Sequence, residues 1–137
     1  MKIAICASMV FAEKMVQIKG QLEQLGHIVY ISQFAEGYLG KPKKEKERLA
    51  VHDKNEHDAI RKFWKIIKKS DAILVLNYDR KGIRNYIGGN TLMEIGFAHV
   101  LDKKVFLMNP IPNIEYYRSE IEAVRPVILE QDLNKII

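Results

Sequence analysis

The sequence predicts a doubly wound α/β fold, in which parallel strands alternate along the chain with helices. Short β-rich or apolar segments alternate with segments of helical periodicity, and the clearest apolar segment, 71–77, shows no polar alternation. A strand of that kind is usually covered on both faces, as in a parallel sheet joined by right-handed helical crossovers. For five strands we expect the flavodoxin-like, Rossmann-like order 2-1-3-4-5, with helices on both faces of the sheet.

The first part of the chain supplies two strands and one helix. Residues 2–7 form an apolar run that predicts a buried strand. Apolar side chains at spacings of three and four predict a helix over 13–25, which Gly26 ends. Residues 27–31 are β-rich and predict the second strand. Residues 34–52 contain two glycines and a proline, so we expect a loop that becomes helical near its end.

The rest of the chain continues the alternation. Apolar faces mark the helices, and a proline ends the last one because the residue before proline disfavours helix. The expected elements are a helix over 56–69, a strand over 71–77, a polar loop over 77–89, a helix over 90–101, a strand over 104–108, a helix over 116–124 and a strand over 127–129.

Length and composition indicate one domain over residues 1–137. Hydrophobic residues make up 47% and charged residues 28%, which excludes a disordered chain, a collagen-like repeat and a disulfide scaffold. The longest apolar run is residues 3–12, whereas a membrane-spanning helix needs about 20 residues. We interpret this run as a strand and turn rather than a signal peptide. The single Cys6 forms no internal disulfide, so we expect a cytoplasmic protein without a membrane partner.

The formal net charge of +5 comes largely from a basic run at residues 41–48. Such a run can indicate nucleic-acid binding. Two glutamates interrupt this one and no aromatic side chains interleave with it, so we expect a solvated segment and no nucleic-acid partner. The histidines lack metal-ligand spacing with carboxylates, and we therefore expect no metal site.

The predicted topology locates a ligand before any motif is considered. In open α/β sheets a ligand binds beyond the carboxyl ends of the strands, where the strand order reverses. That point lies between the first and third strands. It singles out residues 7–11, residues 77–90 and the chain from residue 109 onward.

The first of these segments contains Ala7, Ser8, Met9 and Phe11. It lacks the glycine pattern of a Rossmann dinucleotide site and that of a P-loop, so we expect neither. A turn of small residues before a helix can still offer backbone N–H groups to an anion, with the Ser8 hydroxyl as a further donor. Alternatively, Ser8 simply caps the helix.

The second segment contains Gly88, Gly89, Asn90, Thr91 and Glu94. Paired glycines permit unusual backbone angles or the close approach of a ligand, and Asn90 or Thr91 can cap the helix. Glu94 is the only formally charged side chain in a long neutral stretch. It is either a functional carboxylate or a glutamate that complements the helix dipole or a capping box.

The third segment supplies Asn109, directly after the fourth expected strand. Its side-chain amide can donate and accept hydrogen bonds, which suits a ligand contact. The alternative is a turn residue before Pro110.

Three stretches resemble the nucleoside 2-deoxyribosyltransferase-like superfamily, which includes deoxynucleoside 5′-monophosphate N-glycosidases. Residues 7–11, Ala-Ser-Met-Val-Phe, are similar to its small-residue turn and phenylalanine after the first strand. Residues 70–75, Ser-Asp-Ala-Ile-Leu-Val, look like its third strand. Residues 89–98, with Glu94 two positions before Gly96, resemble its block around a catalytic glutamate.

The resemblance implies a function and a set of site residues. Glu94 falls on the family's nucleophile, which attacks the anomeric carbon of a 2-deoxyribose and forms a covalent glycosyl intermediate that water or a second base resolves. Asn90 and Thr91 would orient the sugar, and Ser8 and Met9 would bind its 5′ end. The implied substrate is a 2′-deoxynucleoside or its 5′-monophosphate, with no cofactor.

The resemblance also implies a homo-oligomer, a dimer or larger, in which residues near the end of the fourth strand reach the neighbouring subunit's site. Asn109 matches that position. The family commonly has an aspartate just after the third strand, where this chain has Asn77 and Asp79.

The acid or base-contacting carboxylate of the family matches less directly. Phe63 stands at the nearest offset, and Gly88 stands where the family often has an aspartate or serine. Asp79 or Asp58 is then the expected acid. Two other functions stay open: a non-catalytic nucleotide-binding or sensing module, and a flavin carrier, which the absence of a Ser/Thr-rich phosphate turn disfavours.

Overall fold

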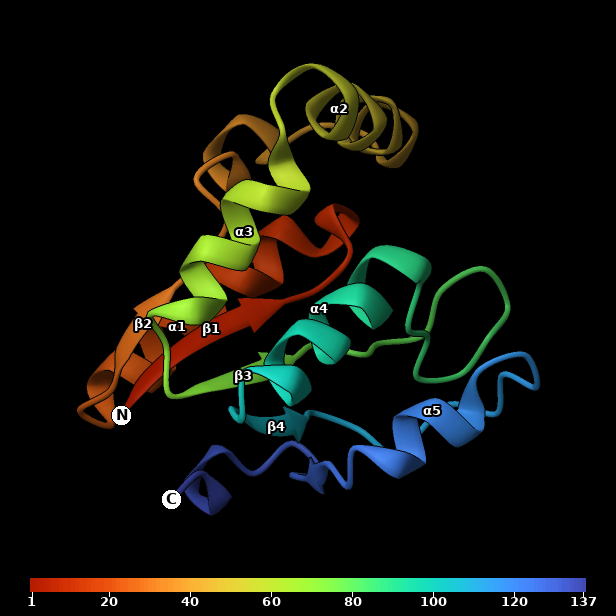
Figure 1. The fold of residues 1–137 in the computed structure, drawn as a ribbon. Helices are drawn as coiled ribbons and strands as arrows, with labels where there is room; N and C mark the ends of the chain where they lie inside the picture. The colour runs from red at the N-terminus through yellow and green to blue at the C-terminus, as the bar shows by residue number, and fades with distance from the viewer.

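A five-stranded parallel sheet forms the centre of the computed structural model, which describes residues 1–137. The strand order is β2-β1-β3-β4-β5, so the predicted fold and order are confirmed (Figure 1). The strands are β1 (Lys2–Cys6), β2 (Ile28–Tyr30), β3 (Ala72–Val75), β4 (Lys104–Leu107) and β5 (Val127–Ile128). The helices are α1 (Ala12–Gln24), α2 (Lys43–Glu56), α3 (Ala59–Lys68), α4 (Gly89–Val100) and α5 (Arg118–Ala123), with short 3-10 helices η1 (Met9–Phe11), η2 (Ala35–Tyr38) and η3 (Leu133–Lys135).

Side chains that alternate along the strands build one apolar core on each face of the sheet. Ile3 and Ile5 of β1 pack in the same core as Leu22 of α1. Ala4 points to the opposite face, where its core includes Ile67 of α3 together with side chains of α4 and α5. The elements therefore form three layers, with the sheet in the middle (Figure 1). None of the helices combines the length and apolar character needed to cross a membrane.

The segment over 34–52, expected to be a loop that becomes helical near its end, is helical from Lys43 onward, so helix α2 begins earlier and is longer than predicted. The sequence concealed this helix because α2 has almost no apolar face, and its one buried side chain is Lys46. The Lys46 ammonium group forms an ion pair with Glu13 and lies 3.4 Å from the Val10 carbonyl oxygen. The expected helix over 56–69 begins later, because Asp58 adopts a left-handed backbone (φ 51°) between α2 and α3.

A tight hairpin interrupts the predicted loop between β3 and α4. Arg80 and Ile83 pair in antiparallel fashion through two backbone hydrogen bonds of 2.9 and 3.0 Å. Lys81 and Gly82, the two residues between them, both have positive φ values, 54° and 73°. This combination is typical of a type I′ turn, which fixes the direction of the side chains on either side of it.

The side chains of Asn77 and Asn109 tie the ends of β3 and β4 together. Asn77 is fully buried, and its amide donates to the carbonyls of Asn109 and Pro110 at 2.9 and 3.1 Å. Its side-chain oxygen accepts from the Asn109 backbone N–H at 2.9 Å, and the Asn109 amide donates to the Asn77 carbonyl at 3.1 Å. Both asparagine side chains therefore stabilise the fold where β3 and β4 end.

We expect Asn77→Ala to lower the free energy of unfolding by about 2–4 kcal/mol, because it leaves several buried backbone groups without partners. Urea denaturation followed by circular dichroism measures the change. Asn113→Ala is the matched control, since Asn113 is exposed and its loss should cost less than about 0.5 kcal/mol. Equal stability of the two variants would contradict this account of Asn77.

Candidate active site

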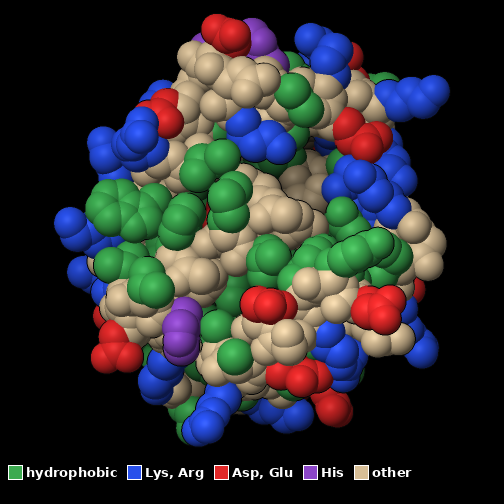
Figure 2. Space-filling model, turned by 45° about the vertical axis from the view of Figure 1, so that its right-hand side comes forward, with side chains coloured by type: hydrophobic (Ala, Val, Ile, Leu, Met, Phe, Trp, Pro, Cys, Tyr) green, Lys and Arg blue, Asp and Glu red, His purple; other side chains and the backbone are tan.

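A cavity of about 320 Å³ opens at the carboxyl ends of β1 and β3, beneath helix α2. It lies at the point where the strand order reverses, as the topology predicted. The space-filling view shows a hollow on this face, with acidic and basic side chains on its rim (Figure 2). Its volume lies in the range of small-molecule sites. The walls come from the loop after β1, from η2, α2 and the start of α3, from the hairpin after β3, and from the first turns of α4.

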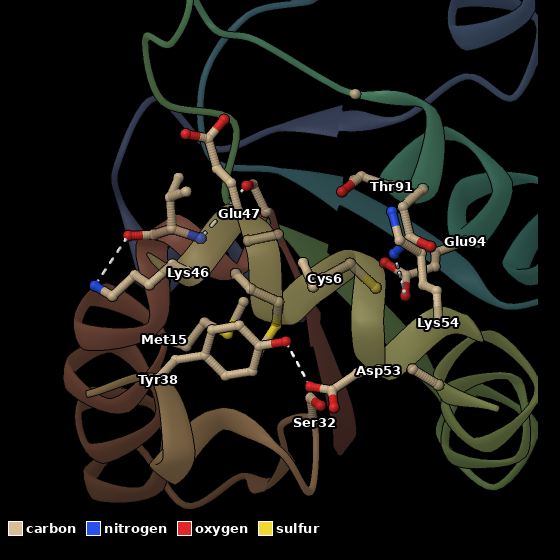
Figure 3. A pocket seen from close by; sticks show the side chains of 18 of the residues that line it. Cys6, Met15, Ser32, Tyr38, Lys46, Glu47, Asp53, Lys54, Thr91 and Glu94 are labelled. Atoms are coloured by element: carbon tan, nitrogen blue, oxygen red, sulfur yellow. Dashed lines mark hydrogen bonds between the residues drawn. The ribbon is translucent and has the colours of Figure 1, made fainter. Parts of the chain in front are cut away.

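Glu94 lies in the wall of this cavity and is only 7% exposed (Figure 3). Helix α4 begins at Gly89, so the carboxyl group lies in its second turn beside Asn90 and Thr91. The Asn90 side-chain amide donates to Glu94 Oε2 at 3.5 Å, a long contact. Burial raises the pKa of Glu94 to about 8, and the neighbouring Cys6 thiol partly opposes this rise. Glu94 is therefore largely protonated at neutral pH.

The loop after β1 brings Ser8 into the cavity. The Ser8 hydroxyl accepts from the Val10 backbone N–H at 3.4 Å and so caps the short 3-10 helix η1. It does not cap α1, as one of the two predicted alternatives had it, because α1 begins only after Phe11. The same hydroxyl accepts from Arg80 Nη1 at 2.9 Å. Phe11 points away from the cavity and packs edge-to-face against Tyr78, with ring centroids 5.4 Å apart.

Arg80 is a site residue that the sequence did not reveal. Its side chain is 11% exposed and reaches from the hairpin after β3 to Ser8 and to Glu47 of α2. The distance from Arg80 Nη2 to Glu47 Oε2 is 3.0 Å. The only available signal was a cation directly before a Lys-Gly turn, which does not show where the side chain points.

A tyrosine–aspartate pair forms another part of the cavity, below Cys6 in Figure 3. The Tyr38 hydroxyl donates to Asp53 Oδ2 at 2.6 Å. Burial, and then the bond to Asp53, raise the pKa of Tyr38 well above its usual value. Met15 and Phe63 supply apolar surface to the same cavity. Asp53 was not predicted as a site residue, because most of α2 was expected to be a loop.

The structure brings only part of the predicted site together. The predicted residues that line the cavity are Ala7, Ser8, Met9, Gly88, Gly89, Asn90, Thr91 and Glu94. Asp79 does not line it, and instead accepts a hydrogen bond from the Asn85 backbone N–H at 2.9 Å in a separate open hollow. Asp58 is exposed and forms an ion pair with Arg61 at 2.9 Å.

Asn77 and Asn109 also lie outside the cavity, since each is engaged in the contacts between the ends of β3 and β4. The Asn109 side chain borders the same open hollow as Asp79. No group of three or more histidine, cysteine, aspartate or glutamate side chains converges in a way that could hold a metal ion.

Two of the solved structures that resemble this one are, by their names, enzymes acting on nucleosides or nucleotides. The first is a 2-deoxyribosyltransferase from the psychrotolerant bacterium Bacillus psychrosaccharolyticus, with 20% sequence identity and a TM-score of 0.51 over 78% of this chain and 71% of that chain. The second is Clostridium botulinum CMP N-glycosidase, BcmB, with 16% identity and a TM-score of 0.50 over 93% of this chain and 88% of that chain. The chain shares their fold. No family model matches the sequence, and no curated protein matches it either.

These two likenesses bear out the predicted fold. At this level of identity they establish the arrangement of strands and helices. The assignment of roles to side chains therefore depends on the geometry of the cavity itself.

We expect Glu94→Gln to change how stability depends on pH. The pKa of Glu94 is higher in the folded protein, about 8, than the ordinary 4.5, so the folded state retains a proton that the unfolded chain releases between these values. Stability contributed by this proton is present below pH 4.5 and is lost as pH rises to about 8, by at most roughly 1.4 kcal/mol per pH unit.

Urea denaturation from pH 5 to 9 tests this expectation. Glu94→Gln should show a flatter profile and gain stability over the unsubstituted protein toward pH 9. The control is Glu115→Gln, at an exposed glutamate, which should follow the unsubstituted protein. Parallel profiles for Glu94→Gln and the unsubstituted protein would show that the Glu94 carboxyl is not held protonated.

Proposed function

We propose that the protein is an enzyme that cleaves or transfers the N-glycosidic bond of a 2′-deoxynucleoside or its 5′-monophosphate. The observation that carries this proposal is the buried Glu94 carboxyl in the wall of a nucleoside-sized cavity at the reversal point of the sheet. The sequence block around Glu94 and the fold shared with a 2-deoxyribosyltransferase and a CMP N-glycosidase support it.

In the proposed reaction, an oxygen of the ionised Glu94 carboxylate attacks the anomeric carbon. The bond from that carbon to the base nitrogen breaks, and its electron pair leaves with the base, which takes up a proton from solvent. Water or a second base then attacks the anomeric carbon of the glycosyl–Glu94 ester and gives up a proton to solvent, which releases the carboxylate and restores the original configuration at that carbon. Asn90 and Thr91 lie one turn before Glu94 on the same face of α4, and in this proposal their side chains orient the sugar.

We assign the base to the region of Tyr38 and Asp53. Asp53 Oδ2 accepts from the Tyr38 hydroxyl, while Oδ1 lies 4.0 Å from His57 Nε2 and makes no hydrogen bond, so it can accept from an N–H group of a base. Phe34 and Phe63 provide the apolar surface that a planar ring requires. In this proposal Asp53 takes the base-contacting role that the sequence had offered to Asp79 or Asp58, neither of which lines the cavity.

A nucleotide-binding or sensing module is the second candidate. This candidate is favoured because neither Asp79 nor Asp58, the two carboxylates expected from the sequence to act as the acid, lines the cavity. A homo-oligomer and a cytoplasmic location, which the resemblance and the composition suggested, stay predictions.

Incubation with the four 2′-deoxynucleosides and their 5′-monophosphates, with and without an acceptor base, should release or exchange a free base that chromatography detects. Glu94→Ala should reduce turnover by about a thousandfold or more, because it removes the nucleophile. The far-UV circular dichroism of this variant should be unchanged. Full activity of Glu94→Ala would contradict the proposed mechanism. Saturable nucleotide binding with no base release would favour the sensing module.

The pH dependence of the reaction gives an independent test. Only the ionised Glu94 carboxylate is a nucleophile, and its pKa is about 8 in the free protein. We therefore expect kcat/KM to rise about tenfold per pH unit below that value and to level off above it. Measurement of kcat/KM from pH 5 to 10 shows whether this rise and the plateau above it occur. A level profile from pH 5 to 7 would show either that Glu94 is already ionised throughout this range or that it is not the nucleophile.

A further inference from the structure

The ion pair between Arg80 and Glu47 lies inside the cavity rather than on the outer surface. The Arg80 side chain is 11% exposed, and the Glu47 side chain, on α2 above it, is 38% exposed. Arg80 Nη1 donates to Ser8 and Nη2 donates to Glu47, but the buried Nε has no partner. A guanidinium group carries five N–H donors in a planar fork, so this arrangement leaves some of the hydrogen-bond donors of Arg80 without an acceptor.

The position of Arg80 is fixed by the backbone below it. The hairpin closed by Ile83 holds its main chain, and the guanidinium lies 5.8 Å from the ring centroid of Tyr86. Because the arginine is held in place before any ligand arrives, little conformational entropy remains to be lost on binding. Glu47 is the more exposed partner, and its helix has almost no apolar face against the body of the protein.

Ser8 adds a donor at the same place. Its hydroxyl oxygen accepts from Arg80 Nη1 and from the Val10 N–H, and its own proton is donated to no protein atom. Arg80 and Ser8 together therefore offer N–H and O–H groups to an oxygen-rich anion. The only anionic oxygens now in contact with the guanidinium are those of Glu47.

We propose that the Glu47 carboxylate occupies the place of a substrate phosphate, and that Arg80 and Ser8 bind this phosphate once Glu47 has moved aside. The inference rests on the proposed function and deepens it, because it selects the 5′-monophosphate over the unphosphorylated nucleoside. Arg80 is then the residue that determines phosphate specificity, and Glu47 is an internal competitor that weakens the binding of any anion there.

Two observations favour a phosphomonoester as the ligand. A phosphate group presents three oxygens and up to two negative charges, which suits an arginine fork and a serine hydroxyl better than one carboxylate does. The other buried cation of the cavity, Lys46, is already paired with Glu13 on α1. Glu13 is held by a second contact, because it also accepts from the Gly40 backbone N–H at 2.9 Å. Glu47 has no hydrogen-bond partner other than Arg80 and is therefore the carboxylate more readily displaced.

Calorimetric titration with inorganic phosphate and with 2-deoxyribose 5-phosphate tests the inference without catalysis. Glu47→Gln should bind both probes about two- to five-fold more tightly, because the competing charge is gone. Arg80→Gln should bind them at least about tenfold more weakly, because a charge-assisted contact is lost. Glu45→Gln is the matched control: Glu45 belongs to an exposed pair with Arg48 on the same helix, and its loss should leave binding unchanged.

The kinetic arm uses the ratio of kcat/KM for a deoxynucleoside 5′-monophosphate to that for the parent nucleoside. Arg80→Gln should lower this ratio at least about tenfold, and Glu47→Gln should raise it. A gain of binding in Glu47→Gln cannot arise from misfolding, so the result stays interpretable if Arg80→Gln folds poorly.

The inference is overturned if neither substitution alters binding of the two probes, or if Arg80→Gln lowers activity on nucleosides and monophosphates equally. In the latter outcome base release still occurs, so the proposed function stands. Conversely, phosphate binding that depends on Arg80 and Glu47 without base release from any substrate supports the phosphate site and rejects the proposed catalysis.

Discussion

The parallel pairing of β1 with β3 is the constraint on which the rest of the site depends. It places the ends of the two strands side by side while the chain leaves them toward different helices. The loop after β1 and the hairpin after β3 therefore face each other across the cavity. Ser8 and Arg80, 72 residues apart in the sequence, meet at 2.9 Å as a direct consequence of this pairing.

The layers around the sheet are held in two different ways. Helices α1, α3 and α4 bury apolar side chains against the strands, so their attachment depends on the hydrophobic effect. Helix α2 is attached mainly by polar contacts, through Lys46 to the first helix, Glu47 to the hairpin and Asp53 to Tyr38. The part of the protein that covers the cavity is thus chemically unlike the part that forms its floor.

Most of the fold followed from the sequence because its strands and helices carry strong apolar patterns. The pattern failed at α2, where contacts with distant residues such as Glu13, rather than an apolar face, stabilise the helix. Glu94 was recognisable as an isolated charge in a neutral stretch. Asp79 and Arg80 were not separable from sequence, because only the hairpin geometry sends the arginine into the cavity and leaves its neighbour outside.

The polar attachment of α2 also makes the entrance of the cavity sensitive to the surrounding electrolyte. Two of its contacts are ion pairs whose acidic partners, Glu13 and Glu47, are 52% and 38% exposed. Dissolved salt screens such partly exposed pairs but leaves apolar burial in the sheet intact or strengthened. Ionic strength therefore changes how firmly helix α2 is held over the cavity, while the strands beneath it keep their positions.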